Sequence, residues 1–172
     1  MSIKRRLLRS QPRVDLLGVF YYLYGMKLLV TLFILLQCIT GKVVKVQDGD
    51  TVTLLTADST QVRVRLDGVD CPEKKQAFGT KAKAFVSDLC FGGVVTVEDK
   101  GKDRYGRVIG VVWVDSINVN EALLRNGLAW HYKQFNNDAR LDSLERAARS
   151  EKLNIWSQPN PIPPWEFRKG KR

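Results

Sequence analysis

The sequence predicts an α+β domain made mainly of β-structure, a five-stranded antiparallel barrel with three helices packed outside it. Segments that alternate apolar and polar residues occur before and after one segment of helical periodicity, and two further helical segments follow. The order strand-strand-strand-helix-strand-strand-helix-helix lacks the regular alternation that builds a parallel sheet. A chain of 172 residues is long enough for one such domain with a sizeable core and short appendages.

Five strands are expected in the barrel. Residues 42–55 form two strands around, or one bent strand containing, the turn Asp48-Gly49-Asp50, because Asp-Gly between two apolar runs is a strong hairpin signal in which glycine tolerates positive φ. Gln61–Leu66 alternates strictly, so that its arginines lie on the face opposite its apolar residues. The other strands are expected at 94–98 and at Val108–Val114, which is apolar throughout and therefore central.

Three helices are expected, at residues 80–89, 118–127 and 137–152. Thr80 is the predicted N-cap of the first. In the second, Asn118 is followed three residues later by Glu121, which is the pattern of a capping box. A small barrel with helices outside it is the arrangement of an OB-fold, which commonly binds nucleic acid.

Residues 1–41 are expected to be a basic, hydrophobic segment that serves as a signal or an anchor. The uncharged stretch at residues 28–40 has 13 residues, which is short for a membrane span of ~20 residues and suits a signal-peptide core. We therefore expect translation to begin at Met26 and cleavage to fall near Thr40 or Gly41, so that the protein is exported. The alternative is an uncleaved helix that anchors the protein in the membrane.

The formal charge of +10 is concentrated at the two ends of the chain. Residues 1–27 hold six basic residues and one acidic residue, and four of the last five residues are basic. Residues 42–157 are expected to form the barrel domain, which is therefore not a uniformly basic coat for nucleic acid. Residues 158–172 are expected to be a Pro-rich basic tail that ends in a disordered segment.

Chemistry-bearing residues gather within about sixty positions of the Asp-Gly turn. They are Asp50, Arg65, Asp70-Cys71-Pro72-Glu73 and Asp103-Arg104-Tyr105-Gly106-Arg107. Hard oxygen ligands, a further carboxylate and two separated arginines are the groups needed to attack a phosphodiester on a divalent metal. His131 is the only histidine, so histidine-based catalysis and a histidine-rich zinc site are excluded.

These motifs, together with Val119-Asn120-Glu121-Ala122-Leu123 and the stretch from Glu151 to Trp156, closely resemble the staphylococcal (micrococcal) nuclease or thermonuclease family. The resemblance runs from about Lys42 to Ser157. It implies an OB-fold and a calcium-dependent nuclease that cuts DNA and RNA and leaves 3′-phosphate ends.

The resemblance also implies a role for individual residues. The expected calcium ligands are Asp50, Asp70 and the main-chain carbonyl of Cys71; the expected catalytic residues are the general base Glu73 and the phosphate-binding Arg65 and Arg107; the expected nucleotide-binding residues are Tyr105, Trp130 and Tyr132. Cys71 stands where the family prototype has threonine. Because the expected ligand is the main-chain carbonyl, a cysteine side chain at this position is compatible with metal binding. Trp130-His131-Tyr132 replaces a pair of tyrosines, so which ring stacks on a base stays open.

Two alternatives to an exported nuclease remain at this level. One is a non-catalytic OB-fold module that binds single strands, and the other is a membrane-tethered calcium-binding or adaptor domain. The presence of Asp50, Arg65, Asp70, Glu73 and Arg107 together favours the enzyme. We expect a monomer that acts on single-stranded or unstructured DNA and RNA. Pairing of the two cysteines of the barrel domain is left open.

Overall fold

A computed structural model describes residues 21–22, 24–27 and 38–170 of the chain. The chain divides into two compact units, Met1–Leu36 and Gln37–Arg172. In the first unit, the described residues 21–22 and 24–27 are helical. No helix among the described residues is long and apolar enough to cross a membrane. Most of the predicted signal or anchor segment lies outside the described residues, so this assignment stays a prediction.

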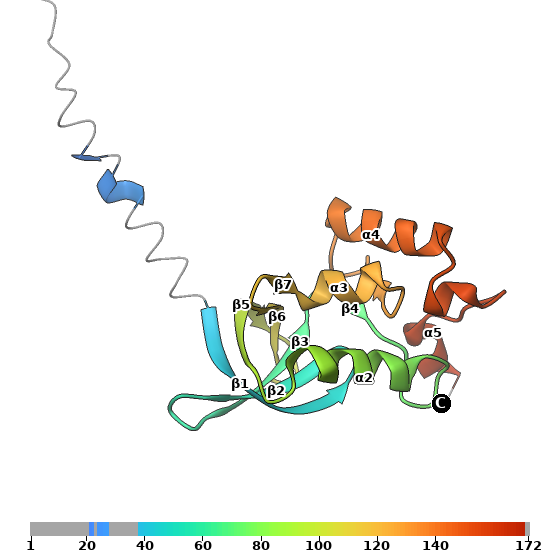
Figure 1. The fold of residues 1–172 in the computed structure, drawn as a ribbon, viewed down its shortest axis with the longest axis horizontal. Helices are drawn as coiled ribbons and strands as arrows, with labels where there is room; N and C mark the ends of the chain where they lie inside the picture. The colour runs from blue at the N-terminus through green and yellow to red at the C-terminus, as the bar shows by residue number, and fades with distance from the viewer. Residues whose placement is uncertain (1–20, 23, 28–37, 171–172) are drawn as a thin grey trace, which may run out of the picture. The chain divides into compact units, whose positions relative to one another are not determined.

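The second unit contains all the strands that the structure describes, together with the helices that surround them (Figure 1). The strands are β1 (Cys38–Asp48), β2 (Thr51–Thr56), β3 (Gln61–Leu66), β4 (Val69–Asp70), β5 (Val94–Lys102), β6 (Val108–Val114), β7 (Ile117–Asn118) and β8 (Trp130–His131). The helices are α2 (Gly79–Cys90), α3 (Val119–Arg125), α4 (Ala139–Ser150), the 3-10 helix η1 (Asn154–Ser157) and α5 (Pro164–Lys169).

Five of the strands close into the predicted barrel. They are ordered β3-β2-β1-β5-β6, with β7 extending the sheet beyond β6. Neighbours in this order are antiparallel, and the barrel closes where β3 pairs with β6 in parallel. The barrel with helices packed outside it is an OB-fold, which confirms the predicted fold class.

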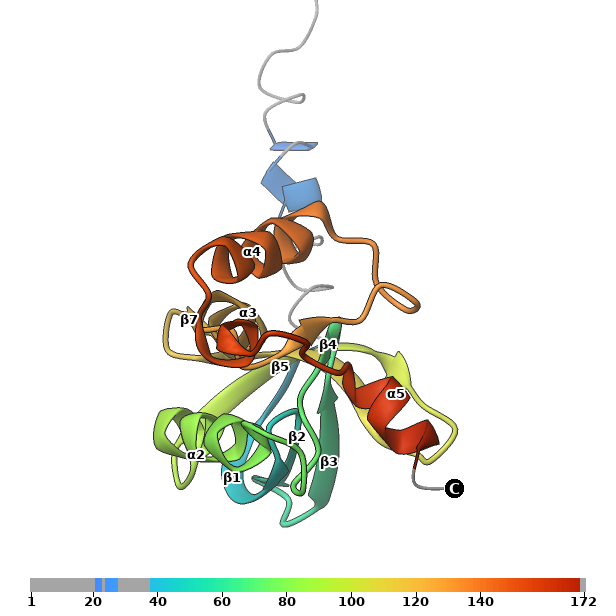
Figure 2. The ribbon, with the colours of Figure 1, turned by 90° about the vertical axis from the view of Figure 1, so that its right-hand side faces the viewer.

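The helices cover the barrel on several sides. α3 lies between α4 and α2 and packs against both (Figure 1). In the perpendicular view, α2 and α5 lie on opposite sides of the strands (Figure 2). As predicted, α3 is capped by the Asn118 side chain, which accepts a hydrogen bond from the Glu121 main chain at 3.0 Å.

Several element boundaries differ from the prediction. β1 begins at Cys38 rather than residue 42, and its first residues pair with β5 from Val94 to Glu98. β5 in turn continues to Lys102 rather than ending at residue 98. The N-cap of α2 is Phe78, in a left-handed conformation with φ of 66°, and not Thr80. A cut at Thr40 or Gly41 would remove the first residues of β1.

The C-terminal segment differs most from its prediction. Residues 164–169, expected to lie in a structureless tail, form the helix α5. Pro164 occupies the first helical position, where its missing N–H costs nothing. The helix holds Arg168, which was expected to be disordered. The helix is ordered because the segment packs against the barrel domain, where Trp165 stacks on Tyr132.

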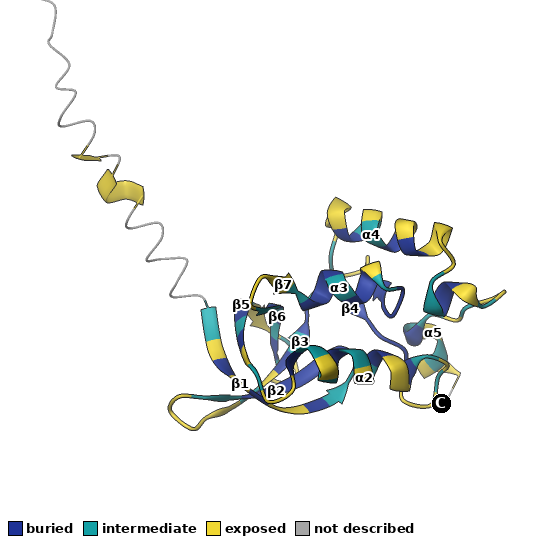
Figure 3. Ribbon diagram, in the orientation of Figure 1, coloured by how far each residue is buried: buried dark blue, intermediate teal, exposed yellow. Residues whose placement is uncertain are grey.

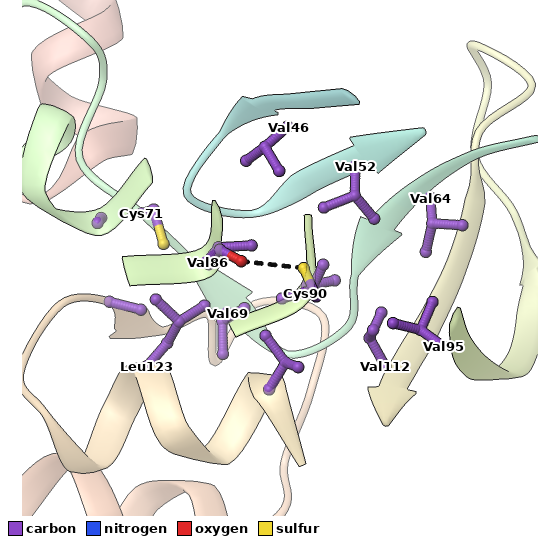
Figure 4. Packing of buried hydrophobic residues seen from close by; sticks show 14 of the residues in the cluster. Val46, Val52, Val64, Val69, Cys71, Val86, Cys90, Val95, Val112 and Leu123 are labelled. Atoms are coloured by element: carbon purple, nitrogen blue, oxygen red, sulfur yellow. Dashed lines mark hydrogen bonds between the residues drawn. The ribbon is translucent and has the colours of Figure 1, made fainter. Parts of the chain in front are cut away.

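The core lies in two clusters. The larger cluster fills the interior of the barrel and the space between the barrel and helices α2 and α3. Most of its side chains are valines and leucines (Figures 3 and 4). Each fully buried side chain of this size stabilises the fold by ~1.5–3 kcal/mol. The smaller cluster joins Trp130, Ala148, Ile155 and Trp156 and is flanked by Trp165 of α5.

Both cysteines of the barrel domain are buried free thiols. Cys90 Sγ donates to the Val86 carbonyl oxygen at 2.9 Å, as an ordinary packed residue near a helix end (Figure 4). Cys71 packs on the turn that joins β1 to β2. Burial raises the pKa of the Cys71 thiol well above its usual value, so this thiol stays neutral.

Gly49 is required in that turn because of its size. It is not among the residues with positive φ, contrary to the reason given for it from sequence. A Cβ placed on Gly49 would lie 2.8 Å from both Ala82 Cβ and Cys71 Sγ. The turn is therefore pressed against α2 and against the segment that follows β4, and this close approach sets the position of Asp50.

We predict that Gly49→Ala lowers the free energy of unfolding by about 1–3 kcal/mol, because the added methyl group overpacks the contact with Ala82 and Cys71. The matched control is Gly93→Ala, whose Cβ would meet its nearest neighbour, the Cys90 carbonyl oxygen, at 3.4 Å. Urea denaturation of both variants measures the effect. Equal stability of the two would contradict the packing role of Gly49.

Candidate active site

The register of the barrel places Arg65 beside the β1–β2 turn. Thr51 is the partner of Arg65 in the ladder between β2 and β3, and the Leu66 N–H donates to the Asp50 carbonyl oxygen at 2.9 Å. Arg65 Nη1 forms an ion pair with Asp50, and its Nη2 lies 2.8 Å from Asp70 Oδ1. One guanidinium thus bridges two aspartates that are 20 positions apart in the sequence.

Strand β4 carries the second aspartate into the same place. Asp70 pairs with Trp130 of β8 and is fully buried. The next residue, Cys71, donates its main-chain N–H to Asp50 Oδ2 at 2.8 Å. The Asp50 carboxylate therefore has a partner on each oxygen, and the two expected metal-ligand segments are tied directly to each other.

The electrostatics of the turn are set by burial and by Arg65. Burial, and then the negative charge of Asp50, raise the pKa of Asp48 to about 7. Burial alone would also raise the pKa of Asp50, but the Arg65 guanidinium and the Cys71 N–H lower it below its usual value. Asp50 is therefore held ionised beside an aspartate that titrates near neutrality. Sequence analysis did not select Asp48, which reads as an ordinary turn residue.

Glu73 lies at the edge of this cluster on the loop before α2. Its main-chain N–H donates to Gln76 Oε1 at 3.1 Å, and the Gln76 N–H donates to the Glu73 carbonyl oxygen at 2.7 Å. These bonds form a tight turn that leaves the carboxylate half-buried. Arg168 of α5 pairs with this carboxylate and with Asp70. Nothing in the sequence pattern selected Arg168.

The donor atoms fit a hard divalent cation. Asp50 and Asp70 converge on the Arg65 guanidinium, and carboxylate oxygens are among the ligands that Ca²⁺ prefers. Within the described ranges, no group of three or more His, Cys, Asp or Glu side chains is arranged to hold a metal. A site here would combine two carboxylates with a main-chain carbonyl and would leave positions for water and substrate oxygens.

The second expected phosphate-binding arginine lies on the turn between β5 and β6. Arg107 directly precedes Val108, the first residue of β6, which pairs with Val64 next to Arg65. Its Nε lies 2.7 Å from Asp103 Oδ2. Tyr105 is exposed and lies beneath Arg104 and Arg107, 4.8 and 5.7 Å from its ring centroid.

The two expected base-stacking residues have different surroundings. Trp130 is 6% exposed and contacts Trp156 edge-on at 4.3 Å between ring centroids, so it is mainly a core residue. Tyr132 is half-buried and stacks on Trp165, with ring centroids 5.4 Å apart and planes 10° apart. Both line a cavity of about 330 Å³, which Trp165, Lys133 and Arg149 also line.

The lone histidine, His131, is buried. Its main-chain N–H donates to the buried Glu145 carboxylate at 3.2 Å. Its ring Nε2 lies 3.4 Å from Asn136 Oδ1. His131 therefore helps to join β8 to α4.

Comparison with known proteins identifies the family to which this fold belongs. The family model of the staphylococcal nuclease homologue matches residues 63–158. The chain is 41% identical over 130 residues to an uncharacterised endonuclease of Haemophilus influenzae, covering 76% of this chain and 73% of that protein. It is 43% identical over 131 residues to an uncharacterised endonuclease of Escherichia coli, with coverage of 76% and 85%. It is 38% identical over 143 residues to a micrococcal nuclease of Shigella flexneri, with coverage of 77% and 82%.

The barrel and these matches define an OB-fold phosphodiesterase that acts on nucleic acid. The chain belongs to the staphylococcal nuclease family and is a nuclease. This confirms the predicted family and enzyme class and favours the enzyme over the alternative of a non-catalytic binding module.

We predict that Arg65→Ala lowers the free energy of unfolding by roughly 3–5 kcal/mol, because it leaves the buried carboxylates of Asp50 and Asp70 without their shared partner. Arg63→Ala, an exposed position on the same strand, is the control and should change stability by about 0.5 kcal/mol or less. Thermal and urea unfolding of both variants provide the measurement. A loss no larger than that of the control would show that the bridge contributes little.

Proposed function

We propose that this nuclease is calcium-dependent, hydrolyses phosphodiester bonds of DNA and RNA, and leaves 3′-phosphate ends. The observation that carries the proposal is the convergence of Asp50, Arg65, Asp70 and Glu73, from the β1–β2 turn, β3, β4 and the loop before α2. The resemblance to the family assigns a role to each of these residues. Calcium bound by Asp50, Asp70 and the Cys71 carbonyl would neutralise and position the scissile phosphate.

In the proposed mechanism, Glu73 acts as the general base. Its carboxylate lies at the edge of the cluster, with side-chain exposure of 36% against 0% for Asp70, so water reaches it. Glu73 takes a proton from a water molecule, whose oxygen attacks phosphorus. The bond from phosphorus to the 5′ oxygen breaks, the leaving 5′ oxygen takes up a proton from solvent water, and the products are a 3′-phosphate and a 5′-hydroxyl. General-base assistance of this kind contributes ~10²–10⁴-fold to rate.

Arg65 and Arg107 are proposed to stabilise the negative charge of the transition state. Negative charge grows on the phosphate oxygens as the water attacks, and planar guanidinium donors stabilise it better than lysine would. Arg65 lies on β3, and Arg107 directly precedes β6, which pairs with β3. The pairing of Arg65 with Asp50 and Asp70 fixes its position, whereas Arg107 lies on a turn and is held by Asp103.

The substrate is proposed to bind across Tyr105 and the cavity lined by Trp130 and Tyr132. Aromatic rings next to cationic side chains suit a nucleotide, because the base stacks and the phosphate is attracted to the cations. Unpaired strands present their bases for such stacking, so we propose single-stranded or unstructured DNA and RNA as the preferred substrates. The enzyme is proposed to act as a monomer.

Export through the N-terminal segment remains part of the proposal, with an uncleaved membrane anchor as the alternative. The supporting observation is the stretch of 13 uncharged residues at 28–40. N-terminal sequencing of the active protein from its native host distinguishes the two. Because β1 begins at Cys38, a mature protein that begins after Gly41 would lack the first residues of its first strand.

The experiment that tests the function incubates the full chain with single-stranded DNA, with either calcium or a chelator, and analyses the product ends. We expect cleavage with calcium, no cleavage with chelator, and 3′-phosphate ends. Products with 5′-phosphate ends would contradict the proposed bond cleavage. Full activity in chelator would contradict the calcium site.

We predict that Glu73→Gln and Arg107→Ala each lower turnover by about 10²-fold or more, because they remove proton transfer and charge stabilisation. Both side chains are only partly buried, so the folded structure should persist, as circular dichroism would verify. The control is Lys75→Gln, an exposed residue of the same loop as Glu73. Near-normal turnover in either purified variant would refute the role assigned to that residue.

A further inference from the structure

Helix α5 is fixed beside the catalytic carboxylates by contacts that do not involve its arginine. Trp165 stacks on Tyr132 and meets Trp130 edge-on at 5.7 Å between ring centroids. Just before the helix, Gln76 Nε2 donates to the Ile162 carbonyl oxygen at 2.6 Å. Pro164 is buried. These contacts hold the C-terminal segment against β8 and against the loop that carries Glu73.

Arg168 spans two carboxylates from this position. Its Nη2 lies 2.9 Å from Asp70 Oδ2, its Nη1 lies 2.9 Å from Glu73 Oε1, and Nη1 also lies 3.3 Å from Asp70 Oδ1. Ion pairs on the surface contribute little to stability. The ion pair between Arg168 and Asp70 differs from these because Asp70 is fully buried. With Arg65 on Oδ1 as well, both oxygens of Asp70 are engaged by guanidinium groups.

We propose that Arg168 is a positioning residue that holds Asp70 and Glu73 and competes with calcium for the Asp70 carboxylate. The inference rests on the proposed function, in which Asp70 is a calcium ligand and Glu73 the general base. A guanidinium and a divalent cation cannot share the same carboxylate oxygens without strong repulsion between their charges. Asp70 Oδ2 is the oxygen that Arg65 does not contact, and Arg168 Nη2 lies on it. Calcium binding at Oδ2 therefore requires Arg168 to leave Asp70, and Arg168 sets the calcium affinity of the site.

The same contacts make the competition reversible. The Arg168 side chain is 42% exposed, so its guanidinium has solvent to enter when it is displaced. Helix α5 need not unfold for this, because Trp165 and Ile162 hold it independently of Arg168. By linkage, an interaction that must be broken for a ligand to bind lowers the affinity for that ligand by a corresponding factor.

The test is calorimetric titration of calcium chloride into the full chain and its variants without nucleic acid. We expect Arg168→Gln to bind calcium at least about tenfold more tightly than the unmodified protein, the factor expected for the loss of ~1.4 kcal/mol of competition. Lys169→Gln, the neighbouring exposed residue with the same change of charge, should leave the affinity within about twofold. Arg168→Lys should fall between them, because it keeps the charge but loses the planar fork.

A second variant weakens the contact between Arg168 and Asp70 without changing Arg168. Trp165→Ala removes the stacking on Tyr132 and loosens α5, so it should also tighten calcium binding while Arg168 stays in the chain. Thermal unfolding of each variant verifies that it is folded. Tighter binding in Arg168→Gln and Trp165→Ala, but not in Lys169→Gln, is the result that supports competition.

Other outcomes overturn the inference, and they separate it from the proposed function. Equal or weaker calcium binding in Arg168→Gln refutes competition and leaves the calcium site standing. Weaker binding of a thymidine nucleotide bearing 3′ and 5′ phosphates, with unchanged calcium affinity, would make Arg168 a direct substrate ligand and refute competition as well. Absence of calcium binding in all variants refutes the proposed calcium site, and the inference fails with it.

Discussion

The bridge formed by Arg65 between Asp50 and Asp70 is the interaction on which the site depends. Two buried carboxylates close to each other are unfavourable unless a cation compensates them. The barrel supplies that cation on a fixed strand, because Arg65 faces Thr51 in the ladder between β2 and β3. The Cys71 N–H then ties the β1–β2 turn to the segment after β4. The position of the carboxylates is thus a consequence of strand register.

The remaining parts of the site are held less tightly, and this division matches their proposed roles. Glu73 and Arg107 lie on turns and are partly exposed, where a general base reaches water and an arginine reaches a substrate. Helix α5 is anchored by aromatic contacts with Tyr132 and Trp130. Because it is six residues long, its order depends on those contacts and not on its own helical stability. The C-terminal segment is therefore the part of the site most open to displacement.

Local sequence patterns predicted most of the fold, because strands and capped helices leave local signals. Asn118 caps α3 as the capping pattern indicated. The start of β1 was missed, since an apolar run before a strand reads equally well as the core of a signal peptide. The ordered position of Arg168 was missed for a different reason. Its carboxylate partner Asp70 is 98 positions away in sequence, and the packing of Trp165 that brings them together has no local signature.

The most direct test of the account is a crystal structure of the full chain with bound calcium, in which the metal is located by its anomalous scattering. The account predicts one peak between the carboxylates of Asp50 and Asp70, within ~2.3–2.6 Å of their oxygens and of the Cys71 carbonyl. It also predicts that the Arg168 guanidinium has moved off Asp70. A calcium peak elsewhere, or a peak at this place with Arg168 still bound to both Asp70 oxygens, would contradict it.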